Sequence, residues 1–255
     1  MKPYVVGIDI GGTNTVFGIV DARGNVIASS SIKTGKHPEV KDYIAELKTA
    51  LDTLLENNDA VDKIAGIGVG APNGNYYTGS IEMAPNLPWK GSVPLAELLK
   101  EAFGVPVAIT NDANAAAIGE MTYGVARGMK DFIMITLGTG VGSGIVVNGQ
   151  LVYGHDGFAG ELGHVTVKPN NGRICGCGRT GCLEAYCSAT GVARTAREFL
   201  EIRTDPSRLR EIPVEDITSK DVYDAAMLGD KIAKEIFEYT GEIMGRAFCN
   251  FVCFS

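Results

Sequence analysis

The sequence predicts an α/β fold built from two related halves. A strand, a glycine-rich turn and a second strand occur over 4–20, and the same pattern returns over 132–147. Strand-like apolar runs alternate with segments in which apolar residues recur every three or four positions, as in helices that cover a sheet. A Gly-containing linker between 119 and 130 separates the halves, so we expect domains over 1–122 and 123–255.

The first half opens with strands joined by tight turns. Three runs rich in β-branched and aromatic residues predict an antiparallel meander over 4–9, 15–21 and 26–32. The next segment, 38–58, carries apolar residues at helical spacing: Tyr43, Leu47, Leu51 and Leu54. Similar reasoning predicts helices over 94–103 and 113–121 and buried strands over 64–70 and 105–110, with an irregular stretch up to Trp89.

The second half repeats the hairpin and then becomes helical. We expect strands over 132–137 and 145–147, joined by a glycine-rich turn over 138–144, and a short strand over 150–153. Apolar spacing predicts helices over 188–201, 219–228 and 230–251.

Composition argues against two classes of partner. The formal net charge of the 255 residues is -7, whereas nucleic acids and anionic membranes require a basic face. No apolar run is long enough to span a bilayer, and Asp9 interrupts the first apolar stretch before a secretory signal could form. We therefore expect a cytoplasmic protein without nucleic-acid or membrane partners.

One imidazole and three thiols crowd into a short, glycine-rich segment of the second half. His164 precedes Cys175, Cys177 and Cys182, and this donor set suits a tetrahedral Zn²⁺ site. Because no signal peptide is expected, metal binding is favoured over disulfides. The alternative is a group of free thiols in a glycine-rich loop. We interpret the other cysteines, Cys187, Cys249 and Cys253, as small buried hydrophobic residues.

Two glutamates flank this segment. Glu161 and His164 are three residues apart and share a face on a helical turn, while Glu184 follows the last cysteine by two residues. Glutamates are usually solvated, but attachment to a metal-stiffened loop favours a binding role. A metal-bound imidazole is neutral and keeps a proton on its second nitrogen, which can donate to a hydroxyl.

Both glycine turns could hold phosphate groups. The first follows Asp9 and contains Gly11, Gly12, Thr13 and Asn14; the second contains Gly138, Thr139 and Gly140. Glycines let backbone N–H groups approach an anion, and the threonine hydroxyls add donors. Asp9 could orient Mg²⁺ through water. A plain hairpin would also explain either turn, and neither matches the Walker or dinucleotide-binding pattern.

The pair Asn111-Asp112 stands where a strand gives way to a helix. Asp112 could be the N-cap of that helix, which contributes about 1 kcal/mol. It could instead be a general base that accepts a hydroxyl proton, as aspartates do in phosphoryl transfer. Asn111 offers a donor and an acceptor, which suits a hydroxyl-rich ligand.

Five motifs in this order resemble the ROK family of bacterial sugar kinases and repressors. They cover most of the chain from residue 4 to 254: Asp9-Ile10-Gly11-Gly12-Thr13, Asn111-Asp112-Ala113-Asn114-Ala115-Ala116, Leu137-Gly138-Thr139-Gly140-Val141-Gly142, Gly160-Glu161-Leu162-Gly163-His164, and Cys175 through Glu184. The resemblance implies a two-domain actin/hexokinase-like (ribonuclease H-like) fold with an interdomain cleft. It also implies ATP-dependent phosphorylation of a hexose, most often glucose, at the 6-hydroxyl, and a homodimer.

The same resemblance implies a role for each candidate residue. Asp112 would be the base, and sugar hydroxyls would be held by Asn111, Glu161, His164 and Glu184. The glycine turns would hold the phosphates of ATP, with Mg²⁺ beside Asp9. Zn²⁺ would be bound by His164, Cys175, Cys177 and Cys182.

Three alternatives remain open at this stage. Kinases for N-acetylmannosamine, fructose or allose share most of these residues, and the segments around Ala71-Pro72-Asn73-Gly74 and Asn86 are expected to decide the sugar. A sugar-responsive repressor would need a DNA-binding segment for which residues before 4 leave no room. Family members continue beyond Ser255, so we expect a C-terminally shortened fold, which keeps a non-catalytic sugar-binding protein in consideration.

Overall fold

The protein is described by a computed structural model that covers residues 2–253. Its contacts group into two compact units, Met1–Phe132 with Gly144–Ala159 and Ile133–Ser143 with Gly160–Ser255. The chain therefore passes from one unit to the other three times. The domain boundary expected after residue 122 stays a prediction.

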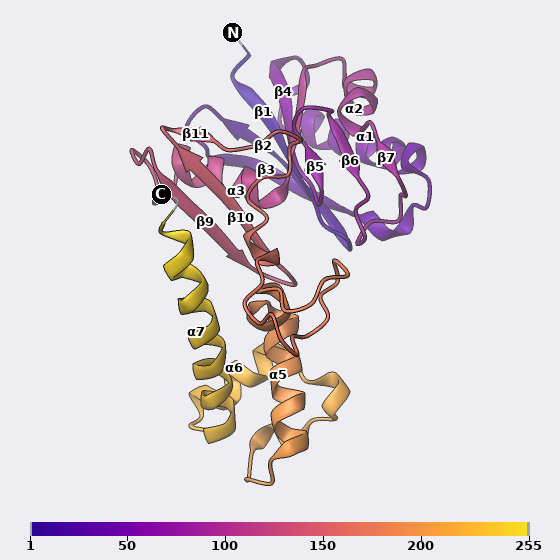
Figure 1. The fold of residues 1–255 in the computed structure, drawn as a ribbon. Helices are drawn as coiled ribbons and strands as arrows, with labels where there is room; N and C mark the ends of the chain where they lie inside the picture. The colour runs from indigo at the N-terminus through magenta and orange to yellow at the C-terminus, as the bar shows by residue number, and fades with distance from the viewer. Residues whose placement is uncertain (1, 254–255) are drawn as a thin grey trace. The chain divides into compact units, whose positions relative to one another are not determined.

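The first unit is built on a five-stranded sheet, in the order β3-β2-β1-β4-β8 (Figure 1). Its strands are β1 Tyr4–Ile10, β2 Asn14–Asp21, β3 Val26–Lys33, β4 Ile64–Gly70 and β8 Val107–Thr110. β1, β2 and β3 pair antiparallel, which confirms the predicted meander. On the other side, β4 pairs parallel with both β1 and β8.

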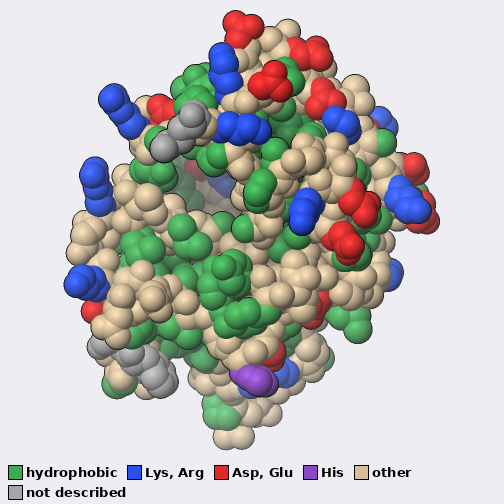
Figure 2. Space-filling view, turned by 90° about the horizontal axis from the view of Figure 1, so that it is seen from above, with side chains coloured by type: hydrophobic (Ala, Val, Ile, Leu, Met, Phe, Trp, Pro, Cys, Tyr) green, Lys and Arg blue, Asp and Glu red, His purple; other side chains and the backbone are tan. Residues whose placement is uncertain are grey.

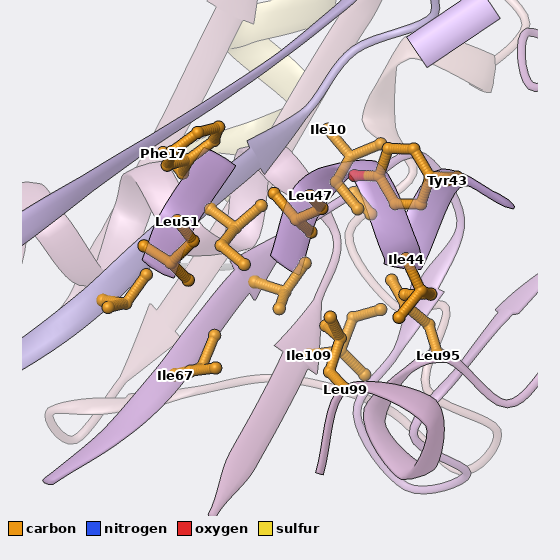
Figure 3. Close-up of a cluster of buried hydrophobic side chains, with 14 of the residues drawn as sticks. Ile10, Phe17, Tyr43, Ile44, Leu47, Leu51, Ile67, Leu95, Leu99 and Ile109 are labelled. Atoms are coloured by element: carbon orange, nitrogen blue, oxygen red, sulfur yellow. The ribbon is translucent and has the colours of Figure 1, made fainter. Parts of the chain in front are cut away.

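Helices α1 (Val40–Asn57) and α2 (Leu95–Phe103) cover one face of this sheet and enclose the core of the unit. Tyr43, Leu47 and Leu51 of α1 are fully buried. Figure 3 shows these side chains gathered with Ile10 and Phe17 of the sheet. The helical spacing read from the sequence therefore identified the buried face of α1.

Helix α3 (Asp112–Thr122) contacts β4 on the opposite face, where β4 carries glycines. Successive residues of a strand point to opposite faces, and Ile67 and Val69 of β4 lie in the α1–α2 core. Gly68 and Gly70 therefore face the other way. A Cβ added to Gly70 would lie 3.2 Å from Cβ of Ala115. Small residues on both elements thus let α3 approach the sheet closely.

The second unit is mainly helical and carries two hydrophobic cores. Its helices are α4 Glu184–Cys187, α5 Ala189–Ile202, α6 Ser219–Met227 and α7 Lys231–Phe251. The short 3-10 helices within residues 2–253 are η1 Thr34–Lys36, η2 Val61–Lys63, η3 Leu162–His164, η4 Arg208–Glu211 and η5 Val214–Asp216. A further sheet, in the order β11-β10-β9, is formed by β9 Phe132–Leu137, β10 Val141–Val147 and β11 Gln150–Leu151. Of these strands, β11 and residues 144–147 of β10 belong to the first unit.

Three local predictions need correction. β10 begins at Val141 rather than at Ile145, because the turn closes within Gly138–Gly140. The stretch expected to be irregular up to Trp89 contains β5 Gly74–Asn75 and β6 Ser80–Glu82, which form a small sheet with β7 Ser92–Val93. These strands are too short to show a period of two in the sequence. Finally, Cys249 and Cys253 are exposed, and only Cys187 of the three is buried.

No helix within residues 2–253 combines the length and apolar composition required to cross a bilayer. On the face seen in Figure 2, acidic and basic side chains are interspersed and form no continuous basic surface. This distribution agrees with the net charge of -7.

Truncation of Leu47 tests the core assignment. Leu47→Ala should lower the free energy of unfolding by about 2–5 kcal/mol, because it removes buried methyl groups and leaves a cavity. Urea unfolding followed by circular dichroism measures this change. Lys41→Ala, at an exposed position of the same helix, should change stability by less than about 0.5 kcal/mol. Equal effects of the two substitutions would contradict the assignment.

Candidate functional site

Parallel pairing brings the candidate residues of the first unit to one edge of the sheet. β1, β4 and β8 run in the same direction, so the segments that follow them emerge at the same edge, where open α/β sheets bind ligands. These segments are the first glycine turn, the loop that begins at Ala71, and Asn111. The backbone N–H of Ala71 donates to the carbonyl of Thr110 at 3.0 Å, which joins the last two segments.

At this edge, Asn111 rather than Asp112 caps α3. The side-chain oxygen of Asn111 accepts a hydrogen bond of 2.8 Å from the backbone N–H of Ala113, as an N-cap does. Asp112 is the first residue of the helix and is exposed, and one of its oxygens also accepts from Ala113. The capping role considered for Asp112 is therefore filled by its neighbour. A carboxylate remains at the positive end of the helix dipole.

The first glycine turn is tight and needs glycine at one position. The N–H of Gly11 donates to the carbonyl of Asn14 at 2.9 Å. A Cβ on Gly12 would lie 2.7 Å from the backbone carbonyl oxygen of Asn86. Thr13 and Asn14 are exposed at the tip of the turn. The turn can therefore present backbone and hydroxyl donors to an anion.

Asp9 precedes this turn, and its pKa is affected by the charge of Asp112. Partial burial, and after it the negative charge of Asp112, raise the pKa of Asp9 above its ordinary value. A divalent cation near these two carboxylates would favour the ionised form of Asp9. Oxygen ligands of this kind suit Mg²⁺, which usually keeps several waters.

In the second unit, the four predicted metal ligands lie together. One donor atom from each of His164, Cys175, Cys177 and Cys182 falls within 4.8 Å of all the others. The Sγ atoms of Cys177 and Cys182 are 3.8 Å apart. Two sulfurs bound to tetrahedral Zn²⁺ at about 2.3 Å would be separated by about 3.8 Å. The donor set and its spacing therefore fit a zinc ion.

The two ring nitrogens of His164 lie near groups that suit this role. Nδ1 lies 3.6 Å from Sγ of Cys175, on the side of the ligand cluster. Nε2 lies 3.9 Å from a carboxylate oxygen of Glu161. A carboxylate near the second nitrogen of a metal-bound histidine fixes the ring and its tautomer.

Glu184 connects the ligand cluster to the second glycine turn. One carboxylate oxygen accepts a hydrogen bond of 3.0 Å from the N–H of Val141, and the other lies 3.5 Å from Sγ of Cys175. A Cβ on Gly140 would lie 2.5 Å from the same carboxylate. Further along, Thr190 donates to the carbonyl of Thr139 at 3.0 Å. The turn is therefore held by the residues that follow the last cysteine.

Ser143 is a positioning residue that the sequence reasoning did not single out. Its hydroxyl is buried, donates to the carbonyl of Gly160 and accepts from the N–H of Leu162 at 3.1 Å. These bonds fix the backbone on both sides of Glu161. The only available signal was a serine within a glycine-rich turn, which does not reveal a partner 17 residues away.

The structure thus assembles two groups, each within one unit. Asp9, the first glycine turn, Asn111 and Asp112 belong to the first unit. The second unit contains Glu161, the metal ligands, Glu184 and the second glycine turn.

Comparison with known proteins identifies similar chains of two kinds. The ROK family model matches residues 5–254. The chain is 38% identical over 250 residues to a glucokinase of Halalkalibacterium halodurans, covering 97% of this chain and 76% of that protein. It is also 30% identical over 256 residues to a xylose repressor of Caldicellulosiruptor bescii, covering 97% and 62% respectively.

Among solved structures, the chain resembles a ROK family glucokinase from Streptomyces griseus in complex with glucose and AMPPNP. The TM-score is 0.79 at 31% identity, over 98% of this chain and 80% of that one. The predicted α/β fold of the ROK sugar kinases is therefore confirmed.

A methyl group at Gly163 tests how closely the turn between Glu161 and His164 packs against Val141. Its Cβ would lie 2.1 Å from the backbone carbonyl oxygen of Val141. Gly163→Ala should lower the free energy of unfolding by about 1–3 kcal/mol, measured by urea unfolding. Gly138→Ala is the control, because nothing lies within 4 Å of its Cβ. Unchanged stability of Gly163→Ala would show that this packing is wrong.

Proposed function

The chain belongs to the ROK family, and on this basis we propose that it transfers a phosphoryl group from ATP to the 6-hydroxyl of a hexose, preferably glucose. The observation that carries the proposal is the exposed carboxylate of Asp112 at the start of α3, which its neighbour Asn111 relieves of the capping role. The relatives named glucokinase support the choice of sugar.

In the proposed reaction, Asp112 is the general base. Its carboxylate accepts the proton of the sugar hydroxyl while that oxygen attacks the γ-phosphorus of ATP, and the bond to the β-phosphate oxygen breaks. Phosphoryl transfer depends mainly on alignment of the reactants and on stabilisation of phosphate charge. A rigid position at the first turn of a helix supplies such alignment for Asp112.

The two glycine turns are proposed to bind the phosphates. In the first turn the donors are backbone N–H groups and the hydroxyl of Thr13; in the second they come from Gly138, Thr139 and Gly140. Asp9 would hold Mg²⁺, which neutralises phosphate charge when bound. The raised pKa of Asp9 supports this role, because a cation would favour its ionised form.

The sugar hydroxyls are assigned to four residues. The capping oxygen of Asn111 is used within the protein, so its amide nitrogen would donate. Glu161 is exposed and lies beside the imidazole of His164, so the pair could share a hydroxyl. Glu184 retains acceptor capacity because each carboxylate oxygen has more than one lone pair.

Zinc is proposed to be a structural ion bound by His164 and the three cysteines. When bound, it would fix the loop that carries Glu161 and His164 and keep the imidazole neutral. Burial raises the pKa of the Cys175 thiol to about 12, so a metal must displace its proton. Metal affinity should therefore fall as the pH is lowered.

Other members of the family keep two alternatives in view. A different hexose, namely N-acetylmannosamine, fructose or allose, would preserve every role given above. A sugar-responsive repressor is represented by the related xylose repressors, and it would bind the sugar without turnover. We extend the proposal to a homodimer, for which the mass in solution is the test.

Phosphorylation of hexoses is the direct test. A coupled assay with ATP over a panel of glucose, mannose, fructose, allose and N-acetylmannosamine should show turnover, highest with glucose. Asp112→Asn should lower kcat by about 10²–10⁴-fold, as loss of a general base does, with sugar affinity nearly unchanged by calorimetry. Sugar binding without turnover of any hexose by the unsubstituted protein would favour the sensing alternative. Full turnover by Asp112→Asn would refute the base assignment.

Removal of one thiolate tests the metal. Cys177→Ser should release zinc, measured by inductively coupled plasma mass spectrometry, and should weaken glucose binding in the same preparation. Cys249→Ser, at an exposed cysteine outside the ligand cluster, should leave both unchanged. Intact sugar affinity after loss of the zinc would remove the metal from the binding argument.

A further inference from the structure

A basic hollow in the second unit has no role in the proposed reaction. Its volume is about 250 Å³, and residues from four segments line it. Lys168 and Arg173 come from the loop before Cys175, and Tyr186 comes from α4. Arg194 and Glu198 lie on α5, and Tyr239 lies on α7. None of them is among the residues proposed to bind the sugar, the nucleotide or the zinc.

The hollow carries an excess of positive charge within an acidic protein. Three cationic side chains surround a single carboxylate, Glu198, which leaves two positive charges uncompensated. Both oxygens of Glu198 are already engaged, one by Arg173 at 2.5 Å and the other by Arg194 at 3.1 Å. Burial alone would raise the pKa of Glu198, but the hydrogen bonds and charges of both arginines lower it, so Glu198 is ionised at neutral pH.

Lys168 is held in place without being neutralised. Its ammonium donates to the hydroxyl oxygen of Tyr239 at 2.7 Å and lies 4.8 Å and 5.5 Å from the ring centres of Tyr239 and Tyr186. Within residues 2–253, no carboxylate forms an ion pair with it. A lysine with a purely structural role would be expected to have one, because a half-buried charge is costly when unpaired. The two rings therefore orient a cation that keeps its attraction for an anion.

Further donors surround this cation. Because Tyr239 accepts from Lys168, its own hydroxyl proton is available for another acceptor. Arg194 is partly exposed beside the hollow. Arg173 is different: its side chain is buried and bonded to Glu198, Thr195 and backbone carbonyls. Arg173 therefore contributes charge and stiffness, while Lys168, Arg194 and Tyr239 offer the contacts.

We propose that this hollow binds a small phosphate dianion, either inorganic phosphate or the phosphate group of a sugar phosphate. The two uncompensated charges match those of a dianion, and lysine and arginine are the usual protein ligands of phosphate. The volume lies below the roughly 300–1,000 Å³ typical of pockets for drug-sized molecules, so the bound group must be small. The inference is independent of the proposed kinase activity.

Calorimetric titration of the zinc-loaded chain with inorganic phosphate and with glucose 6-phosphate tests the site, in a buffer whose chloride concentration is held constant. Saturable binding of at least one probe is expected. Lys168→Gln should weaken it by about tenfold or more, the factor that a charge-assisted hydrogen bond contributes. Tyr239→Phe should weaken it less, because the ring beneath the ammonium remains. Lys234→Gln is the control, because Lys234 is an exposed lysine of α7, the helix that carries Tyr239.

Two outcomes would overturn the proposal. The first is that neither probe binds at concentrations up to about 10 mM, a Kd that corresponds to a binding free energy of about 2.7 kcal/mol. The second is that binding survives Lys168→Gln but is lost in Thr13→Ala, which would place the anion at the first glycine turn. Zinc content and melting temperature without phosphate establish that each variant is folded. Should Lys168→Gln fail to fold, Arg194→Gln carries the same test. Binding of inorganic phosphate identifies the phosphate group as sufficient, whereas binding of glucose 6-phosphate alone identifies a sugar phosphate.

Discussion

Parallel pairing of β1 with β4, and of β4 with β8, determines where the first unit can act. If β8 ran the other way, Asp112 would emerge at the edge opposite Asp9, and its charge would not raise the pKa of Asp9. β2 returns antiparallel beside β1, which keeps the first glycine turn at that edge as well. The strand directions, more than any single side chain, therefore concentrate two carboxylates, an amide and a glycine turn in one place.

The segment of the second unit that carries the metal-ligand cluster is ordered in a different way. Between Gly160 and Leu183 the chain forms no regular element except the single turn η3. Its conformation depends on short backbone bonds, such as the one from Cys175 to the carbonyl of Arg179, and on glycines that adopt positive φ, among them Gly178. Glu184 then fastens this segment to the second glycine turn. A metal ion at the ligand cluster would complete a structure that burial alone supports weakly.

Sequence reasoning succeeded where a pattern has physical length. Helical spacing in α1 identified its buried face, and the close spacing of the cysteines predicted a cluster that the structure assembles. It failed for β5–β7, whose strands are too short to show a period of two in the sequence. It also missed Ser143, since its partners become visible only after folding. Local propensity therefore predicted elements, while tertiary hydrogen bonds determined the details of the candidate site.

Adjacent polar residues illustrate why those details matter. From the sequence, Asp112 could have been the N-cap of α3 or a general base. In the structure Asn111 is the N-cap, and one oxygen of Asp112 also accepts from Ala113. With Asn111 in that position, the helix is satisfied by a neutral amide and the charged group is left at its exposed first turn. The same principle separates Glu198, whose two oxygens are both occupied by arginines, from Lys168, whose charge has no counterion among the described residues. A polar group can bind a ligand only if the fold has not already engaged it in hydrogen bonds or ion pairs.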